Sequence, residues 1–490
     1  MGNLLVSPVT DKSTHRGKTS DGELDFAVSS MQGWRVHMED AHICEPELFA
    51  EELVGETVEK APAVSTKRDE SEDSRGLVKK AKMNESPSSN VGGGGDNETP
   101  SGDDDSKMKQ PETDDSKQST DQTYRKIELP NHSLFAVFDG HGGSFAAEYS
   151  GLNFVRVFSR QPSFIEYARF FHEHQAKAST EETTPTEQAQ IQRHGVELIE
   201  KAFRDAFLDI DREIWRVVNH LKNKDYILPT KKNDADNYDD ANGESEEDSY
   251  HFDHQDSGTT AVVVMFTPEY IICANAGDSR SVYSKQGNCA IPLSYDHKPD
   301  DEEEERRIVE AGGFVRVGRV DGDLAVSRGL GDFRFKVNEL YKLMGTASVA
   351  DMPFLNEDNR TKKRERSHEQ YVILPDDQKV SPVPDIVVQK RDRELDEFVV
   401  VACDGIFDVQ TNHECVSMTA QIFQDGESDI GLVCEEIIDM CLEKGSKDNM
   451  TALVVKFHAQ PVGNGGGVAR RRELRQEAAE EEDKSSSELR

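Results

Sequence analysis

The chain has 490 residues, which is enough for two or three average domains or for one large domain with insertions. Asp and Glu total 95 against 58 Lys and Arg, and the net charge of -37 argues against non-specific binding to nucleic acid. Only 35% of the residues are hydrophobic, so we expect part of the chain to be disordered.

The seven cysteines are scattered singly and form no CxxC pair, so their spacing argues against a zinc site. No N-terminal apolar region resembles a signal peptide, and no run approaches the length of a membrane span. We therefore expect a reducing location, in the cytoplasm, the nucleus or both.

The N-terminal residues, MGNLLVSP, leave two readings open. Gly2 would suit N-myristoylation, although Val6 stands where that pattern wants Ser or Thr. Three basic residues between positions 12 and 18 would then add weak attraction to an anionic membrane. The other reading, a plain flexible terminus over residues 1–22, is the one that the sequence favours.

The first strand is predicted over Phe26–Gln32, and a short charged cluster follows it. Arg35 could grip phosphate oxygens with its planar guanidinium, and Glu39 and Asp40 could order water around a metal ion. A surface ion-pair cluster is the alternative, and this stretch taken by itself favours it.

The stretch LFAVFDGHGG carries the strongest local signal. Leu134–Phe138 is a short apolar run of strand-forming residues that stops at Asp139. Gly140 and the glycines after His141 would let backbone carbonyls and a ligand approach closely. A hard cation prefers oxygen ligands of this kind, and phosphate chemistry uses a histidine beside them. An ordinary strand followed by an Asp-Gly turn is the alternative.

The other elements follow from apolar periodicity. Helices are predicted from residue 143 to about Phe158, and over Ile165–Ala178, Glu187–Leu221, Asp300–Ala311, Asn412–Gln424 and Ile430–Lys444. Strands are predicted over Thr259–Phe266, Tyr270–Asn275, Ser281–Ser284, Ala290–Leu293, Phe398–Cys403 and Thr451–Phe457.

Three polar tracts interrupt this pattern, at about residues 47–128, 222–256 and 337–380. They cannot bury enough apolar surface to offset the entropy of ordering, so we predict disordered insertions. One folded domain is then expected over residues 23–458. A charged tail over 459–490 follows, whose charge blocks leave a frayed helix or disorder open, and we expect it to be largely disordered. The basic cluster Lys362–Arg366 is either a nuclear-import signal or a solvated loop, and the loop is favoured.

Three carboxylates, those of Asp139, Asp404 and Asp448, stand where an apolar strand meets a turn. Packed sheets can bring such ends together, and clustered carboxylates repel one another unless cations neutralise them. Oxygen ligands alone select Mg²⁺ or Mn²⁺ over zinc, and two such ions bridged by one Asp would activate a water for attack on phosphorus. The alternative treats each Asp as a turn former.

The chain resembles the metal-dependent Ser/Thr protein phosphatases, the type 2C or PPM family. The matching stretches, in the order of the family, are MQGWRVHMEDAH, FAVFDGHGG, DSGTTAVVV, ANAGDSRSV, DGDLAVSRGLGD, VVACDGIFDV and SKDNMTALVV. The resemblance implies an α+β fold: a four-layer α-β-β-α sandwich in which antiparallel helices flank two antiparallel β-sheets.

The resemblance also implies a metal centre of two Mg²⁺ or Mn²⁺ ions. Asp139 would bridge them, the carbonyl of Gly140 would bind one of them, and Asp404 and Asp448 would complete the set. A weaker third metal site is implied at Asp278 and Asp408.

The remaining implied roles concern the substrate. Arg35 would hold the phosphate, and His141 would be the general acid that protonates the leaving serine or threonine oxygen. Glu39 and Asp40 would help through water or hydrogen bonds. Three further residues match family positions beside the metals or the cleft: Asn449, Thr260 and Arg319.

The function implied is hydrolysis of phosphoserine and phosphothreonine in proteins, with water as the nucleophile and no phospho-enzyme. The partners expected are phosphoprotein substrates, with no nucleic acid, weak membrane association if Gly2 is acylated, and a monomeric chain. The alternative is a catalytically silent scaffold that binds partners through its acidic tracts, for which a metal carboxylate should be missing. The three insertions depart from the family pattern, and the third leaves substrate preference open.

Overall fold

The computed structural model describes residues 4–57, 121–178, 184–221, 256–337 and 373–488. Most of the three predicted insertions, Gly2 and the basic cluster Lys362–Arg366 lie outside these residues. The chain divides into two units, one of residues 1–52 with 125–490 and the other of residues 53–124. The sandwich described below belongs to the first unit.

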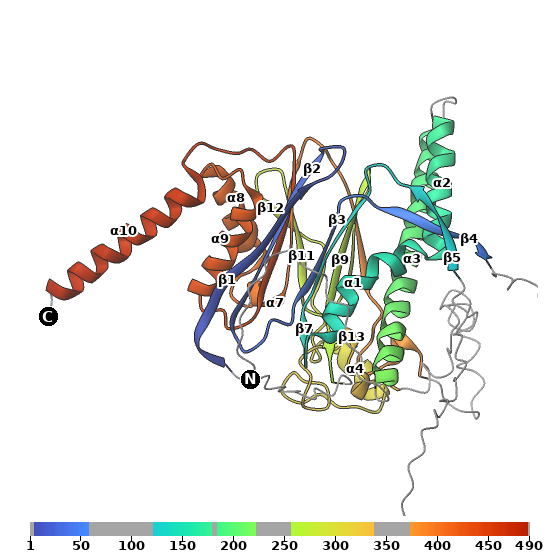
Figure 1. Cartoon of the computed structure of the whole chain (residues 1–490), viewed down its shortest axis with the longest axis horizontal. Helices are drawn as coiled ribbons and strands as arrows, with labels where there is room; N and C mark the ends of the chain where they lie inside the picture. The colour runs from blue at the N-terminus through green and yellow to red at the C-terminus, as the bar shows by residue number, and fades with distance from the viewer. Residues whose placement is uncertain (1–3, 58–120, 179–183, 222–255, 338–372, 489–490) are drawn as a thin grey trace, which may run out of the picture. The chain divides into compact units, whose positions relative to one another are not determined.

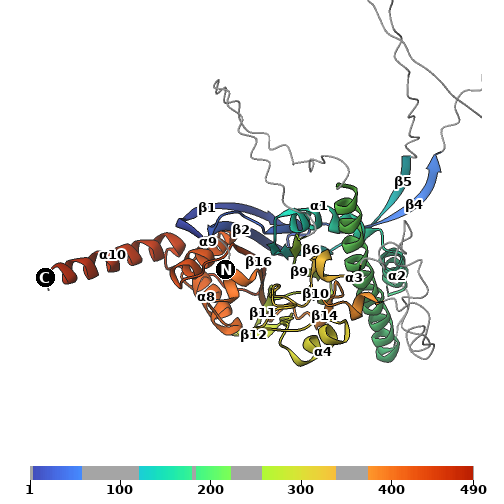
Figure 2. The ribbon, with the colours of Figure 1, turned by 90° about the horizontal axis from the view of Figure 1, so that it is seen from below.

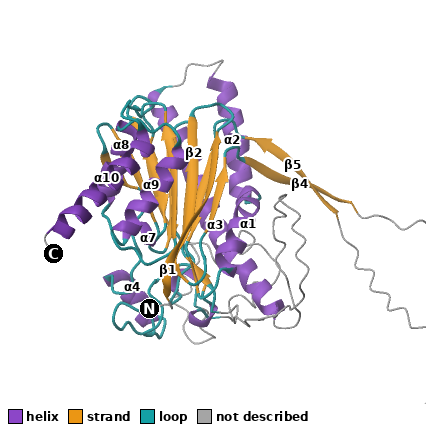
Figure 3. Ribbon diagram, turned by 60° about the vertical axis from the view of Figure 1, so that its left-hand side comes forward, coloured by secondary structure: helices purple, strands orange, loops and turns teal. Residues whose placement is uncertain are grey.

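Two antiparallel sheets form the centre of the fold (Figure 3). The six-stranded sheet has the order β1 (Leu4–Lys18), β2 (Leu24–Arg35), β16 (Met450–Phe457), β15 (Asp396–Ala402), β11 (Arg280–Lys285) and β12 (Cys289–Pro292). The five-stranded sheet has the order β14 (Asp385–Lys390), β10 (Tyr270–Ala276), β9 (Ala261–Phe266), β6 (Ser133–Phe138) and β3 (Ala41–Glu45).

The central strands are buried on both faces, which explains the apolar runs in their sequences. Every residue of β6, β9 and β15 is buried. Such runs are typical of strands covered on both sides. Aromatic side chains join the sheets, with ring centroids 4.9 Å apart for Phe26 and Phe135 and 5.7 Å apart for Phe266 and Phe457. This layer of side chains is the core of the sandwich.

Helices cover the outer faces of both sheets (Figures 1 and 2). On the five-stranded sheet lie α1 (Phe145–Ser159), α2 (Pro162–Ala178) and α3 (Pro185–Leu221). On the six-stranded sheet lie α7 (Asp404–Phe407), α8 (Asn412–Gln424) and α9 (Ile430–Glu443). The predicted apolar stripe of α3 faces the core, with Phe203, Phe207 and Ile214 fully buried. The predicted four-layer α-β-β-α architecture is confirmed.

Smaller elements complete the described chain. A three-stranded sheet joins β13 (Leu330–Gly331), β8 (Gly258–Thr259) and β7 (Gly140–His141), and a two-stranded sheet joins β4 (Phe49–Thr57) and β5 (Asp121–Glu128). The other helical segments are α4 (Glu302–Glu310), α10 (Gly467–Glu488), and the single 3-10 turns η1 (Phe333–Phe335) and η4 (Pro375–Asp377). Among the described helices, none has both the length and the apolar character required to cross a bilayer.

Both predicted flexible ends require correction. Leu4–Lys18 is the edge strand β1, paired with β2 and anchored by an ion pair of 2.6 Å between Lys12 and Asp439. Gly467–Glu488 is the helix α10, in which Arg475 donates a hydrogen bond of 2.9 Å to Glu436. Parts of the predicted insertions are also ordered, because β4, β5 and η4 begin or end inside their limits.

Candidate metal centre

The predicted metal carboxylates meet at one end of the sandwich. Asp139 follows β6, Asp278 lies in the turn between β10 and β11, Asp404 begins α7 directly after β15, and Asp448 precedes β16. In one sheet β9 pairs antiparallel with both β6 and β10, and in the other β15 pairs antiparallel with β16. Within each sheet, the strand ends that carry the carboxylates therefore lie on the same side, and the turn at Asp278 joins the two sheets there.

A pocket of about 380 Å³ opens at this end. Its lining contains most of the predicted site: Arg35, Asp139, Gly140, His141, Thr260, Asp278, Arg319, Asp404 and Asp448. Asp408 does not line it and is exposed at the end of α7, although its charge still acts on Asp404. Of the two residues predicted for a third metal, only Asp278 therefore faces the pocket.

Asp139 and Asp404 are adjacent. The backbone N–H of Asp404 donates to Oδ2 of Asp139 at 3.3 Å, and the carbonyl of Asp139 accepts from the backbone N–H of Thr260 at 2.9 Å. Burial raises the pKa of Asp139 well above its ordinary value, and the neighbouring carboxylates raise it further. The pKa of Asp404 is raised for the same two reasons, burial first and then Asp278.

This cluster holds more negative than positive charge, and its two central carboxylates have no cationic partner among the described residues. Among the described residues, no lysine or arginine forms an ion pair with Asp139 or Asp404, while Arg35 pairs with Asp448 and Lys298 pairs with Asp278. Several carboxylates in one buried place repel one another, and oxygen-binding divalent cations would remove that repulsion. The donor set therefore fits a hard metal ion.

Asp40 lies behind Asp139, and one of its oxygens supports the same conclusion. Its Oδ2 accepts a hydrogen bond from Thr451 Oγ1 at 2.7 Å, while its buried Oδ1 has no hydrogen-bond partner among the residues that the structure describes. Burial is the largest cause that raises the pKa of Asp40 to about 7. A buried oxygen without a donor is costly, and a metal-bound water is a donor that would satisfy it.

Cys403 completes a geometric triad with Asp40 and Asp139, since their donor atoms all lie within 4.8 Å of one another. We do not assign its sulfur as a ligand. Burial raises the pKa of the Cys403 thiol well above its ordinary value, and its Sγ donates to the carbonyl of Asn449 at 3.5 Å. A metal binds the thiolate, whereas these contacts suit the neutral thiol.

Glu39 and Asn449 hold the loop after β2 against the site. Asn449 Oδ1 accepts from the backbone N–H of Glu39 at 2.9 Å, and Glu39 Oε1 accepts from that of Gly143 at 3.1 Å. A Cβ on Gly140 would lie 2.2 Å from the carbonyl oxygen of Glu39, so this close approach of two backbones requires glycine. Glu39 therefore fixes the glycine loop from the outside of the pocket.

His141 has a partner that the sequence analysis missed. Its Nε2 lies 2.9 and 3.0 Å from the two carboxylate oxygens of Asp332, whose side chain is 2% exposed. Burial opposes a positive charge on His141, but the attraction of Asp332, with smaller contributions from Asp278 and Glu39, outweighs it and raises the pKa of the imidazole. Asp332 ends the quoted stretch DGDLAVSRGLGD, and its place directly after Gly331 is the one feature of the sequence that could have indicated it.

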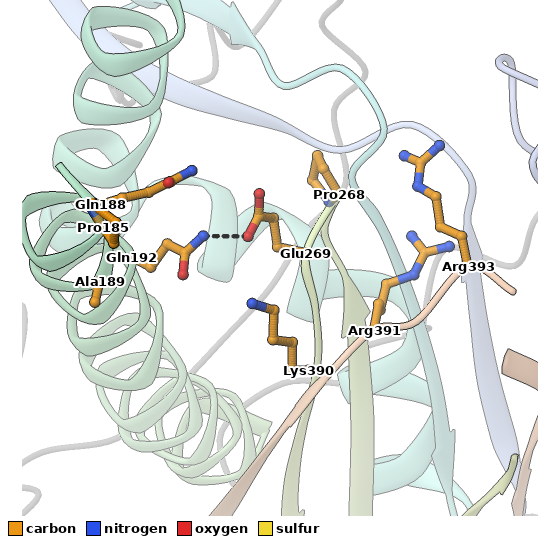
Figure 4. A pocket seen from close by; sticks show the side chains of 9 residues that line it. All are labelled: Pro185, Gln188, Ala189, Gln192, Pro268, Glu269, Lys390, Arg391 and Arg393. Atoms are coloured by element: carbon orange, nitrogen blue, oxygen red, sulfur yellow. Dashed lines mark hydrogen bonds between the residues drawn. The ribbon is translucent and has the colours of Figure 1, made fainter. Parts of the chain in front are cut away.

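A second, larger pocket of about 550 Å³ has a different character (Figure 4). It lies at the opposite end of the five-stranded sheet, beside the turn between β9 and β10, and Lys390, Arg391 and Arg393 give it positive charge. Its one carboxylate, Glu269, accepts a hydrogen bond of 2.5 Å from Gln192. Volume alone therefore does not identify the metal centre, which the carboxylates locate in the smaller pocket.

Residues 112–450 match the family model described as "Protein phosphatase 2C". The chain belongs to this family. Similar curated proteins include "Protein phosphatase ppm-1.A" of Caenorhabditis elegans, 29% identical over 462 residues that cover 94% of this chain and 64% of that protein. "Protein phosphatase 2C homolog 2" of Saccharomyces cerevisiae is 28% identical over 461 residues, which cover 93% and 62%. The chain thus spans less than two thirds of the length of these two phosphatase 2C relatives.

Among solved structures, the "serine-threonine phosphatase 2C from Toxoplasma gondii" is 16% identical, with a TM-score of 0.49 and coverage of 91% of this chain and 99% of that one.

Proposed function

We propose that this protein phosphatase 2C chain is a metal-dependent protein serine/threonine phosphatase. One observation carries the proposal: a buried group of carboxylates with too few cations shares a pocket with Arg35 and His141. Membership of the family supports the reaction. The site supports a complete set of metal ligands, because each predicted metal carboxylate except Asp408 lies at the pocket. A scaffold that had lost catalysis would be expected to lack at least one of them.

The residues that would hold two Mg²⁺ or Mn²⁺ ions are Asp139, Asp404 and Asp448, with the carbonyl of Gly140. Asp278 is placed to help with a third, and Asp408 is placed less well because it is exposed. When bound, such ions supply the positive charge that makes water a nucleophile at neutral pH. An all-oxygen donor set is of the kind that Mg²⁺ and Mn²⁺ prefer to softer ligands, which supports either of these ions.

Arg35 would bind the phosphate of the substrate. Its guanidinium lines the pocket and is paired with Asp448, so it is held at the edge of the carboxylate group. A planar guanidinium can donate two parallel hydrogen bonds to phosphate oxygens, which positions the phosphorus for attack.

His141 would protonate the leaving oxygen. Asp332 occupies the side of Nε2, which leaves Nδ1 as the nitrogen that would carry the proton to the substrate. The raised pKa keeps a larger fraction of the imidazole protonated near neutral pH, as a general acid requires.

Water is the nucleophile in this proposal, as the resemblance to the type 2C phosphatases implies, and the pocket lining offers no free hydroxyl or thiol that would compete with it. The single hydroxyl residue of the lining, Thr260, has its Oγ1 2.7 Å from Ser279 Oγ. No covalent phospho-enzyme is therefore expected.

The proposal is tested by hydrolysis of a phosphothreonine peptide with Mn²⁺, with and without a chelator. We expect turnover that the chelator abolishes and that added Mn²⁺ restores. Absence of turnover in the full chain, or turnover that the chelator leaves unchanged, would reject the proposal.

The role of His141 is tested by the leaving group. His141→Ala should slow the phosphothreonine peptide by roughly 10²-fold or more, and p-nitrophenyl phosphate much less, because nitrophenolate leaves without a proton. Equal losses on the two substrates would remove the general-acid assignment.

A further inference from the structure

Helix α3 carries a carboxylate that is completely enclosed by the protein. The side chains of Asp211 and Lys336 are both 0% exposed, and Lys336 Nζ lies 2.8 Å from Asp211 Oδ1. A buried ion pair of this kind adds little stability by itself, since removing two charges from water largely offsets their attraction. Its contacts therefore suggest another role.

Both members of the pair also bind the same short loop. Lys336 Nζ donates a second hydrogen bond, of 3.0 Å, to the carbonyl of Gly329, and Asp211 Oδ1 accepts one of 2.8 Å from the backbone N–H of Gly331. The pair thus holds β13 from two sides. The next residue in the chain is Asp332, the partner of His141.

Asp332 needs this support because of its backbone. Its φ of 54° lies in the left-handed region, which is uncommon for a residue with a side chain. Its backbone N–H donates to the carbonyl of Ser257 at 3.1 Å, so two contacts at Gly331 and Asp332 set the direction of the carboxylate. In that direction both oxygens reach His141 Nε2.

We propose that the Asp211–Lys336 ion pair is a positioning device for the general acid: it fixes Gly329–Gly331, and through them the contact of Asp332 with His141. This inference rests on the proposed phosphatase function. It gives a role in catalysis to Asp211 of α3 and to Lys336 in the segment after η1, and neither residue lines the pocket.

The chain offers a matched control on the same helix. Asp209 lies two residues earlier, about 200° around the helix axis. It is similarly buried, with 7% exposure of its side chain, and pairs with Arg212 at 2.9 Å. It accepts a hydrogen bond of 3.0 Å from Gln161 rather than from the loop before Asp332. Substitution of either residue should therefore lower the stability of the protein. Only substitution of Asp211 should also disturb the position of Asp332.

The test compares Asp211→Asn with Asp209→Asn in the full chain with Mn²⁺. Asp211→Asn should lower kcat on a phosphothreonine peptide by on the order of 10-fold or more, and should change kcat on p-nitrophenyl phosphate by less than about 3-fold. Asp209→Asn should leave the ratio of the two rates as in the wild type. If the two variants change the ratio equally, or neither changes it, the inference is wrong.

A second variant separates positioning from folding. In the double variant Asp211→Leu with Lys336→Met, the buried charges are replaced by apolar side chains, a change that often leaves stability intact. Because the backbone N–H of Gly331 and the carbonyl of Gly329 also lose their buried partners, we expect a lower melting temperature but a cooperative unfolding transition above the assay temperature, together with the same loss of rate on the phosphothreonine peptide. A folded double variant with the wild-type ratio would overturn the inference. An inactive wild type would reject the proposed function instead, so the two failures can be told apart.

Discussion

The two ends of the strand sandwich both bury carboxylates, but they treat them differently. Away from the metal centre, Asp396 accepts hydrogen bonds from the Tyr283 hydroxyl and from the backbone N–H of Asp392 at 2.9 Å. Glu397, in the same strand, accepts from Ser284 at 2.7 Å and from two backbone N–H groups. These carboxylates are satisfied by the protein itself.

At the other end, Asp139 and Asp404 mainly face other carboxylates, and burial and mutual repulsion raise the pKa of each. A buried charge without a partner is unfavourable for folding, so such a cluster is retained for what it binds. The comparison teaches that burial of an acid does not indicate function, whereas burial of several acids with too few internal donors and cations does.

The largest effect on turnover is expected when Asp139, at the end of the sandwich that carries the metal centre, is made neutral. Asp139→Asn should lower turnover of a phosphothreonine peptide by roughly 10³-fold or more, since a bridging ligand is lost. In metal-free buffer its melting temperature should equal or exceed that of the wild type, because repulsion is relieved. Turnover and thermal unfolding check this, and retained turnover would contradict the bridging role.

The same kind of substitution at the other end, where the protein itself hydrogen-bonds the carboxylates, should lower stability and leave turnover unchanged. Asp396→Asn removes the charge that faces the buried guanidinium of Arg391, so we expect a loss of about 3 kcal/mol in the free energy of unfolding. Turnover per folded molecule should not change. Denaturant unfolding measures the free energy of unfolding. An equal loss of turnover in Asp396→Asn and Asp139→Asn would show that the two ends do not differ in function.

A smaller effect is expected from His132, which precedes β6 at the satisfied end. Its Nε2 lies 2.7 Å from the Tyr167 hydroxyl and its Nδ1 lies 2.8 Å from the carbonyl of Pro130. Burial lowers the pKa of His132 to about 4, with the backbone contacts opposing that shift and His172 adding to it. The folded state therefore keeps His132 neutral while the unfolded state takes up a proton below its ordinary pKa of about 6.5.

Stability should accordingly fall as the pH decreases from about 6.5 towards 4. Linkage gives about 2 kcal/mol of this loss between pH 7 and pH 5. The variant His132→Gln cannot take up a proton and is the control: its unfolding free energy, compared with that of the wild type at each pH, should lack this contribution. Parallel curves for the two proteins would show that His132 does not titrate in this way.

Much of the sandwich could be predicted because its strands and helices are locally consistent. In the run before Asp139 and in the stripe of α3, the order of apolar residues in the sequence itself indicates which side chains are buried. The edge strand β1 and the helix α10 do not, since they are polar and depend on distant partners: Lys12 on Asp439, and Arg475 on Glu436. Tertiary contacts of that kind leave no local periodicity to read.

The candidate site likewise divides into residues that the sequence could predict and residues that it could not. The residues at strand ends were predictable from the change from apolar run to acid and glycine, and the structure brings Asp139, Asp404 and Asp448 to one pocket. Asp332 and Lys298 were missed because their roles depend on loop geometry: one reaches His141 from a left-handed backbone, and the other pairs with Asp278. Asp408 was predicted for a third metal and proves to be exposed, outside the pocket.

The central claim is that the unsatisfied carboxylates form a centre for two divalent cations. Calorimetric titration of Mn²⁺ into the chelator-treated full chain tests it most directly, with Asp139→Asn and Asp396→Asn titrated alongside. We expect at least two ions per chain in the wild type and in Asp396→Asn, and a loss of the tight binding in Asp139→Asn. No binding by the wild type, or the same stoichiometry and affinity in all three proteins, would contradict the account.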